Sequence, residues 1–301
     1  MNQRNNLAIL KINLVISSQW DEYDLLDSGD GKKLEKVGPY TLIRPEPEAL
    51  WKPVLDANVW KKGQAVFQPG QGEESGHWKL FQSIPERWHL TFRNLKFWIQ
   101  LCSSRHIGFF PEQAAQWDWI ENQVRSSTRS LRVLNLFGYT GIASLAAANA
   151  GANVTHIDAS RKAIQWAREN QALSGLQEKP IRWMVDDALK FVYREQRRGN
   201  HYDGIILDPP KFGRGPKGEV WEFYKLLPNL LSACAEILSN EPQFFLLTAY
   251  AVKASALTLY EAVYEIMKRF HGETQAGELV LKEKSAGRLL SRAIYASWQK
   301  N

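Results

Sequence analysis

The chain is organised around residues 131–158, LRVLNLFGYTGIASLAAANAGANVTHID. Residues 131–136 are almost continuously apolar, which is typical of a strand buried on both faces of a sheet. Gly138 and Gly141 indicate a tight turn, and the small apolar residues that follow favour a helix packed closely on the sheet. A second apolar run then ends at Asp158. Strand, turn, helix, strand and terminal acid together predict half of a nucleotide-binding site.

The same alternation continues toward the C-terminus. We predict strands over 131–136, 153–157, 181–185, 203–208 and 243–249. Helices are predicted over 141–150, 160–173, 187–198, 220–238 and 254–270. Two further strands, 277–282 and 292–298, have no long helix between them, so they predict an antiparallel pair at one edge. The whole pattern favours a doubly wound, Rossmann-like α/β sheet.

The N-terminal part differs in character from the rest of the chain. Eight of the 12 tryptophans precede residue 120, and short aromatic or alternating runs are separated by turn signals. We expect a small antiparallel β-rich domain over 1–105 and a larger domain over 106–301; the expected strand runs are 40–44, 65–67, 77–81 and 88–92. The aromatic residues either form the core of this domain or present a stacking surface for bases, with lysines and arginines nearby.

Residues 106–120 connect the two parts. Pro111 marks the start of a helix, because proline suits the first helical turn. Phe109 and Phe110 lie just before it, and they either anchor the linker or form a wall of the ligand pocket.

Composition limits the classes of protein to which the chain can belong. The 301 residues are 44% hydrophobic and 23% charged, which is ordinary for a globular protein, and the net charge of +6 slightly favours a polyanionic partner. No apolar run approaches the ~20 residues that span a bilayer. The first residues, MNQRNNLAILKINLVI, lack the cleavage site of a signal peptide. Cys102 and Cys234 are too few for a disulfide framework or a Cys-rich zinc site, so we expect a cytoplasmic, metal-free, non-membrane protein.

The turn and the acids at strand ends predict the ligand. The spacing of Gly138 and Gly141 is Gly-x-x-Gly, and the G-x-G-x-x-G pattern that binds a pyrophosphate is absent. A nucleoside without a pyrophosphate, such as S-adenosyl-L-methionine, fits better. Asp158 follows Gly138 by about 20 residues, the spacing of an acid that binds ribose hydroxyls. Asp187 follows the third strand and is expected to accept from the adenine amino group. Either acid has an alternative role as a helix cap.

The predicted cofactor site consists of turn residues and strand-end residues: Phe137, Gly138, Tyr139, Thr140, Gly141, Asp158, Ala159, Asp187, Ala188 and Asp208.

The fourth strand ends in residues 208–215, DPPKFGRG. Two prolines after an acid fix an exposed backbone whose carbonyls can point at a substrate. Phe212 can stack on a planar base, and Lys211 and Arg214 can hold phosphate. A purely structural turn would explain the two prolines. It would not explain the acid, the cations and the aromatic residue beside them. The predicted catalytic residues are Asp208, Pro209, Pro210, Lys211 and Phe212.

With these motifs in hand, the chain resembles the class I S-adenosylmethionine-dependent methyltransferases. The motifs are VLNLFGYTG at 133–141, Asp158 in HIDAS and DPPKF at 208–212. GFFPEQ at 108–113 resembles a Gly-Phe-Phe-x-x-Gln segment in the branch that contains large-subunit rRNA base methyltransferases. The resemblance covers about 106–301. It implies a seven-stranded methyltransferase sheet, S-adenosyl-L-methionine as the cofactor and ribosomal RNA as the substrate.

Some members of that branch make 5-methylcytosine, which requires a cysteine thiolate to add to C6 of the ring. In the family this cysteine follows the fifth strand or lies beside the Pro-Pro motif, and neither place holds a cysteine here. We therefore expect transfer to a nitrogen and not to cytosine C5. Lys211 stands where Asp-Pro-Pro-aromatic amino methyltransferases carry the aromatic, with Phe212 one place later. That departure keeps a ring nitrogen such as guanine N7 open beside an exocyclic amine.

Two other functions stay open. A methyltransferase for a small molecule or a protein would show no salt-dependent RNA binding. A cofactor-binding protein without turnover would use its N-terminal domain for interactions. The sequence predicts no oligomeric state.

Overall fold

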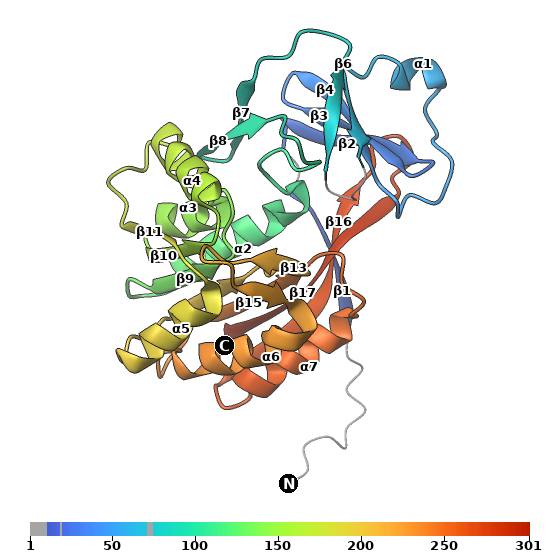
Figure 1. Ribbon diagram of the computed structural model, residues 1–301. Helices are drawn as coiled ribbons and strands as arrows, with labels where there is room; N and C mark the ends of the chain where they lie inside the picture. Colours follow the sequence, from blue (N-terminus) through green and yellow to red (C-terminus); the bar gives the residue numbers. More distant parts are fainter. Residues whose placement is uncertain (1–10, 19, 71–74) are drawn as a thin grey trace.

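An eight-stranded sheet forms the centre of the molecule (Figure 1). The computed structural model describes residues 11–18, 20–70 and 75–301. In spatial order the strands are β1 (Ile12–Ile16), β16 (Gly272–Lys282), β17 (Leu289–Lys300), β15 (Phe244–Ala249), β12 (Gly204–Leu207), β9 (Arg132–Leu136), β10 (Asn153–Asp158) and β11 (Ile181–Val185). The predicted antiparallel pair is confirmed, because β17 runs antiparallel to both β15 and β16. All seven predicted strands are present, and β1 adds an eighth, parallel to β16.

Helices cover both faces of the sheet (Figure 1). One group consists of α2 (Ala114–Arg125), α3 (Ile142–Asn149) and α4 (Arg161–Leu173), and the other of α5 (Ala188–Arg197), α6 (Phe223–Glu236) and α7 (Ala256–Met267). Neighbouring residues of one strand serve opposite faces. Ile205 packs in the cluster of α5, α6 and α7, whereas Ile206 packs with Ile120 of α2. Both are buried, as strands between two helical layers require.

The β-rich part is a five-stranded sheet and a separate hairpin. The sheet contains β2 (Tyr23–Gly29), β3 (Lys32–Val37), β4 (Tyr40–Pro45), β5 (Ala65–Pro69) and β6 (Gly76–Leu80); the short helix α1 (Ala57–Trp60) lies between β4 and β5. The hairpin is β7 (Arg87–Phe92) with β8 (Leu95–Gln100). The expectation of purely antiparallel pairing is wrong, because β4 and β5 run parallel. The 19-residue connection over 46–64, which contains α1, gives the chain room to return in the same direction.

Most aromatic residues of this part form a core. Trp88 and Phe97 are buried in one cluster with Phe109 and Trp117 of the following segment, and the ring centroids of Phe97 and Phe109 are 5.7 Å apart. A ring enclosed in this way cannot stack on a base. The core interpretation is therefore confirmed for these residues.

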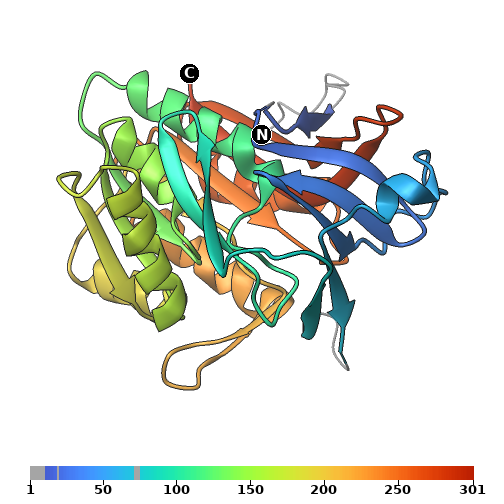
Figure 2. The same cartoon turned by 90° about the horizontal axis from the view of Figure 1, so that it is seen from above.

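The β-rich part of the chain contacts the central sheet and its helices directly. Although β1 precedes residue 105, it pairs with β16, and Trp98 of β8 receives a hydrogen bond from the Trp166 indole of α4. The tip of the β16–β17 hairpin reaches back, where the Lys284 amide donates to the Leu25 carbonyl (Figure 2). Elements on both sides of residue 105 therefore pack together. One strand of the predicted 1–105 domain, β1, belongs to the central sheet.

No helix in the described part of the chain is long and apolar enough to cross a membrane.

The β1–β16 contact leads to a test of the eighth strand. A Cβ added at Gly277 would lie 2.1 Å from the Asn13 carbonyl oxygen, so Gly277→Ala forces β1 away from β16. We expect faster amide hydrogen exchange over 12–16 and a free energy of unfolding lower by about 1–3 kcal/mol. Glu273→Ala, an exposed change on β16 beyond the β1 pairing, is the control. Unchanged exchange over 12–16 in Gly277→Ala would refute the pairing.

Candidate active site

The site lies where the strand order reverses. β9 pairs with β10 on one side and with β12 on the other, so the chain leaves the centre of the sheet in both directions. Ligands of open α/β sheets bind at such a point, beyond the carboxyl ends of the strands. A cavity of about 660 Å³ opens there. Of the predicted site residues, it is lined by Phe137, Tyr139, 158–159, 187–188 and 208–212.

The turn after β9 is left-handed at alternate residues. Phe137, Tyr139 and Gly141 have φ of 59°, 50° and 84°. Two of the three are not glycine. Non-glycine residues in the left-handed region are strained, and they cluster at ligand sites. Gly138 is required for space, since a Cβ would lie 2.3 Å from Cε1 of His156, which is fully buried.

Three predicted turn residues do not face the large cavity. Gly138 and Thr140 line a smaller adjoining cavity of about 40 Å³, and Gly141 lines neither of these two. The Thr140 hydroxyl donates to the Gly108 carbonyl at 2.7 Å. Their direct contact with the cofactor stays a prediction, whereas their role in shaping the turn is visible.

Asp158 holds the turn in place. Its Oδ2 accepts from the Tyr139 amide at 2.9 Å and its Oδ1 from the Ser160 amide at 2.8 Å. Burial raises the pKa of this carboxyl. The helix-cap alternative is wrong, because Ser160 caps α4 through its hydroxyl. Asp158 therefore faces the cavity with a carboxylate oriented by the backbone.

Asp187 caps α5. Its Oδ1 accepts from the Lys190 amide at 2.9 Å, and the neighbouring Asp186 pairs with Arg194. The capping alternative is thus confirmed for Asp187. The same residue lines the cavity, and no described residue donates a hydrogen bond to its second oxygen. Capping and ligand binding are compatible here.

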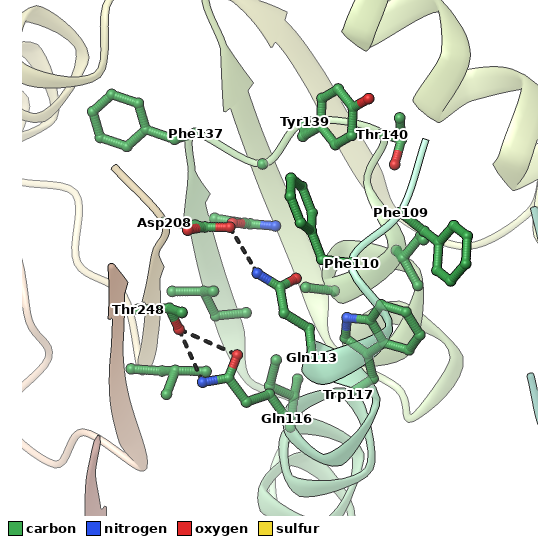
Figure 3. A pocket seen from close by; sticks show the side chains of 17 residues that line it. Phe109, Phe110, Gln113, Gln116, Trp117, Phe137, Tyr139, Thr140, Asp208 and Thr248 are labelled. Carbon is green, nitrogen blue, oxygen red and sulfur yellow. Dashed lines mark hydrogen bonds between the residues drawn. The ribbon is translucent and has the colours of Figure 1, made fainter. Parts of the chain in front are cut away.

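Asp208 is held by a residue from the segment before the core. Gln113 follows Pro111 in the 3₁₀ turn Pro111–Gln113, and its Nε2 donates to Asp208 Oδ2 at 2.8 Å (Figure 3). Burial raises the pKa of Asp208 to about 7. The Gln113 hydrogen bond acts against this rise, and the charges of Glu112 and Asp158 add to it. Asp208 thus titrates near neutral pH at the edge of the cavity, as acid–base groups in enzymes often do.

The two prolines differ in their availability. The Pro210 carbonyl accepts from the Trp221 indole at 2.6 Å, so the expectation that both carbonyls point at a substrate is wrong. No hydrogen bond from the residues described occupies the Pro209 carbonyl. Pro209 is buried and lines the cavity next to Asp208.

The segment after the prolines is a hairpin. β13 (Phe212–Arg214) pairs antiparallel with β14 (Val220–Glu222). The predicted helix start at 220 is wrong, because β14 occupies 220–222 and α6 begins at Phe223. Phe212 is 57% exposed, which leaves its ring available for contact with a substrate.

The sequence analysis assigned no role to Gln113 or Tyr250 and left the role of Phe110 open. Gln113 bonds Asp208, while the Phe110 ring lies between those of Tyr139 and Tyr250, at centroid distances of 5.8 and 5.1 Å. The Tyr250 hydroxyl is buried near the Gln113 side chain, without a well-formed hydrogen bond to a described residue. Its place one residue after β15 is the signal that could have found it, because strand ends meet at this edge.

The paired phenylalanines take both of the roles left open for them. Phe109 is 2% exposed and packs with the aromatic core, so it anchors the linker. Phe110 is more exposed, and both phenylalanines line both cavities.

Neither cysteine lines either of these two cavities. Cys234 is fully buried in α6, and burial raises the pKa of its thiol. Burial likewise raises the pKa of Cys102. Both thiols are therefore poor nucleophiles. In the part of the chain that the structure describes, no group of three or more His, Cys, Asp or Glu could hold a metal ion.

Comparison with known proteins agrees with the resemblance to S-adenosylmethionine-dependent methyltransferases. A family model described as S-adenosylmethionine-dependent methyltransferase matches residues 65–265. The crystal structure of the SAM-dependent methyltransferase from Agrobacterium tumefaciens is 45% identical, with a TM-score of 0.92 over 96% of this chain and 94% of that one.

Curated relatives are matched over part of their length. Ribosomal RNA large subunit methyltransferase K/L of Shewanella baltica is 38% identical over 118 residues, which are 38% of this chain and 16% of the relative. Ribosomal RNA large subunit methyltransferase K of Neisseria meningitidis is 24% identical over 221 residues, 71% of this chain and 61% of the relative. The chain thus spans less than two thirds of either protein. Since the family model covers most of the chain, the chain belongs to the S-adenosylmethionine-dependent methyltransferase family.

Proposed function

We propose that this enzyme transfers the methyl group of S-adenosyl-L-methionine to a base nitrogen in ribosomal RNA. The observation that carries the proposal is that the Asp208 carboxyl and the unoccupied Pro209 carbonyl, two acceptors, lie side by side at the cavity edge with no cysteine lining it. The names of the matched relatives, which are ribosomal RNA large subunit methyltransferases, support RNA as the substrate. The net charge of +6 suits a polyanion.

The cavity residues fit the cofactor. The Asp158 carboxylate accepts from the ribose hydroxyls, and the second oxygen of Asp187 accepts from the adenine amino group. Ala159 and Ala188 leave room for the planar adenine. Phe137 and Tyr139 place the turn after β9 against the methionine end of the cofactor. The bound cofactor supplies an electrophilic methyl group on a sulfonium.

The acceptor nitrogen is held by the end of β12. Asp208 and the Pro209 carbonyl accept hydrogen bonds from an amine, which directs the nitrogen lone pair toward the methyl group. Asp208 then receives the proton that the amine loses. Phe110 and Tyr250 flank the base, and Phe212 stacks on it or on its neighbour. A paired base has to be extruded before it reaches this depth.

The whole chain contributes to this function. The β-rich part before residue 105 serves RNA binding, and residues 106–301 serve catalysis. We place the protein in the cytoplasm. An exocyclic amine is the first candidate acceptor, and a ring nitrogen such as guanine N7 is the second, because Lys211 stands where related amino methyltransferases carry an aromatic.

The pH dependence of the reaction tests the role of Asp208. The carboxylate has to be ionised, so kcat/KM for RNA is expected to rise about tenfold per pH unit below pH 7 and to level off above it. Gln113→Leu removes a donor that favours the ionised form, and the midpoint should move to higher pH. Gln116→Leu is the control, because Gln116 lies one turn later and bonds Thr248 instead. A midpoint that stays unchanged in Gln113→Leu would count against this role.

The substrate is tested with ribosomal RNA from a strain lacking the gene. Incubation with the protein and labelled cofactor should place label in one N-methylated nucleoside, identified by mass spectrometry after digestion. The double variant Cys102→Ser, Cys234→Ala should keep at least half of the activity, and Asp208→Ala should lose at least 100-fold. Label in 5-methylcytosine, or only in protein or small molecules, would contradict the proposal.

A further inference from the structure

Part of the cavity wall is built by cationic side chains that the proposed reaction does not use. They are Lys33 of β3, Arg44 of β4, Arg105 of the loop after β8 and Arg292 of β17. We call these four residues the cationic wall. They come from both the β-rich part and the central sheet, so the wall exists only where the two meet.

Arg44 is fully engaged within the protein. Its Nε and Nη2 donate to the two oxygens of Glu35 at 2.7 and 2.9 Å, and its Nη1 donates to the Arg105 carbonyl at 3.0 Å. Burial favours the neutral form of Glu35, but Arg44 and Lys33 outweigh it and lower its pKa to about 2. Arg44 therefore acts as a brace that fixes the backbone carrying Arg105.

Arg105 and Arg292 retain donors for a ligand. Arg292 uses Nη1 to pair with Glu46, while its Nε is buried without an acceptor and its Nη2 has no partner among the residues described. The Arg105 side chain makes no ion pair or hydrogen bond with a described residue. Lys33 lies behind them, 3.3 Å from Glu35 and 3.5 Å from Glu46.

Carboxylates offset most of the charge of the cationic wall. Its four cations face three buried carboxylates, those of Glu35, Glu46 and Glu112. Glu112 interacts electrostatically with Arg44 and Arg292, which offsets its charge. Glu48 also interacts electrostatically with Arg105 and Arg292, so carboxylates balance most of this charge. What suits an oxyanion is the set of guanidinium donors that Arg105 and Arg292 leave unused at the cavity wall.

We propose that Arg105 and Arg292, backed by Lys33, bind the phosphate of the nucleotide whose base reaches Asp208. This subsite rests on the proposed function and extends it, because it makes the β-rich part a wall of the acceptor pocket. The methionine end of the cofactor carries a carboxylate, which is the same oxyanion chemistry from a second source. The test therefore measures cofactor and RNA separately.

Arg105→Gln is the main variant, because it breaks no ion pair between described residues. With RNA as substrate we expect its KM to rise at least fivefold. The slope of log kcat/KM against log salt should become shallower by about 0.7–0.9, the value for one lost phosphate contact. The Kd of S-adenosylhomocysteine should stay unchanged. Arg292→Lys keeps the charge beside Glu46 but loses the planar guanidinium. It should also raise the KM for RNA and make the salt slope shallower. Arg129→Gln, at the amino ends of the central strands and away from the cavity, is the control.

A direct measurement separates this proposal from the proposed function. Inorganic phosphate should bind the protein without RNA, in calorimetry at low salt, and Arg105→Gln should weaken its Kd at least fivefold. That result would stand even if the substrate were not ribosomal RNA. A weakened Kd for S-adenosylhomocysteine with an unchanged salt slope would assign the wall to the cofactor and overturn the proposal. Unchanged values in every assay would overturn it as well.

Discussion

The hydrogen bond from Gln113 to Asp208 is the contact on which the site depends. It joins a segment that precedes the core to the end of β12, 95 residues later. Without it, a carboxylate whose pKa burial already raises to about 7 would lose the donor that favours its charged form. The same turn places Phe110 against Tyr139 and Tyr250. One short segment thus positions both the acid and an aromatic wall.

The β-rich part and the central sheet form one structure around the cavity. β1 extends the sheet, the β7–β8 hairpin packs on α4, and the β16–β17 hairpin returns to β2. These contacts bring Arg105 and Arg292 to the same wall. The proposed substrate, if bound at this wall, would contact both parts at once.

The sequence predicted what depends on local periodicity and missed what depends on distant pairing. The buried strands and the acids at their ends were predictable, because continuous apolar runs and strand-end positions need no partner. β1 was missed because its residues alternate between exposed and half-buried at a sheet edge. The β13–β14 hairpin was not predicted, because the prolines and glycines around it are typical of a loop. Gln113 and Arg292 acquire their roles only from residues far away in the chain.

The central claim is that the strand-order reversal holds the cofactor with its reactive end toward Asp208. A crystal structure of the complex with S-adenosylhomocysteine tests it most directly. We expect both ribose hydroxyls within hydrogen-bond distance of the Asp158 carboxylate, the adenine beside Asp187, and the sulfur on the side of the cavity that carries Asp208. An adenosine bound away from Asp158, or a sulfur shielded from Asp208 by the turn at 137–141, would contradict the account.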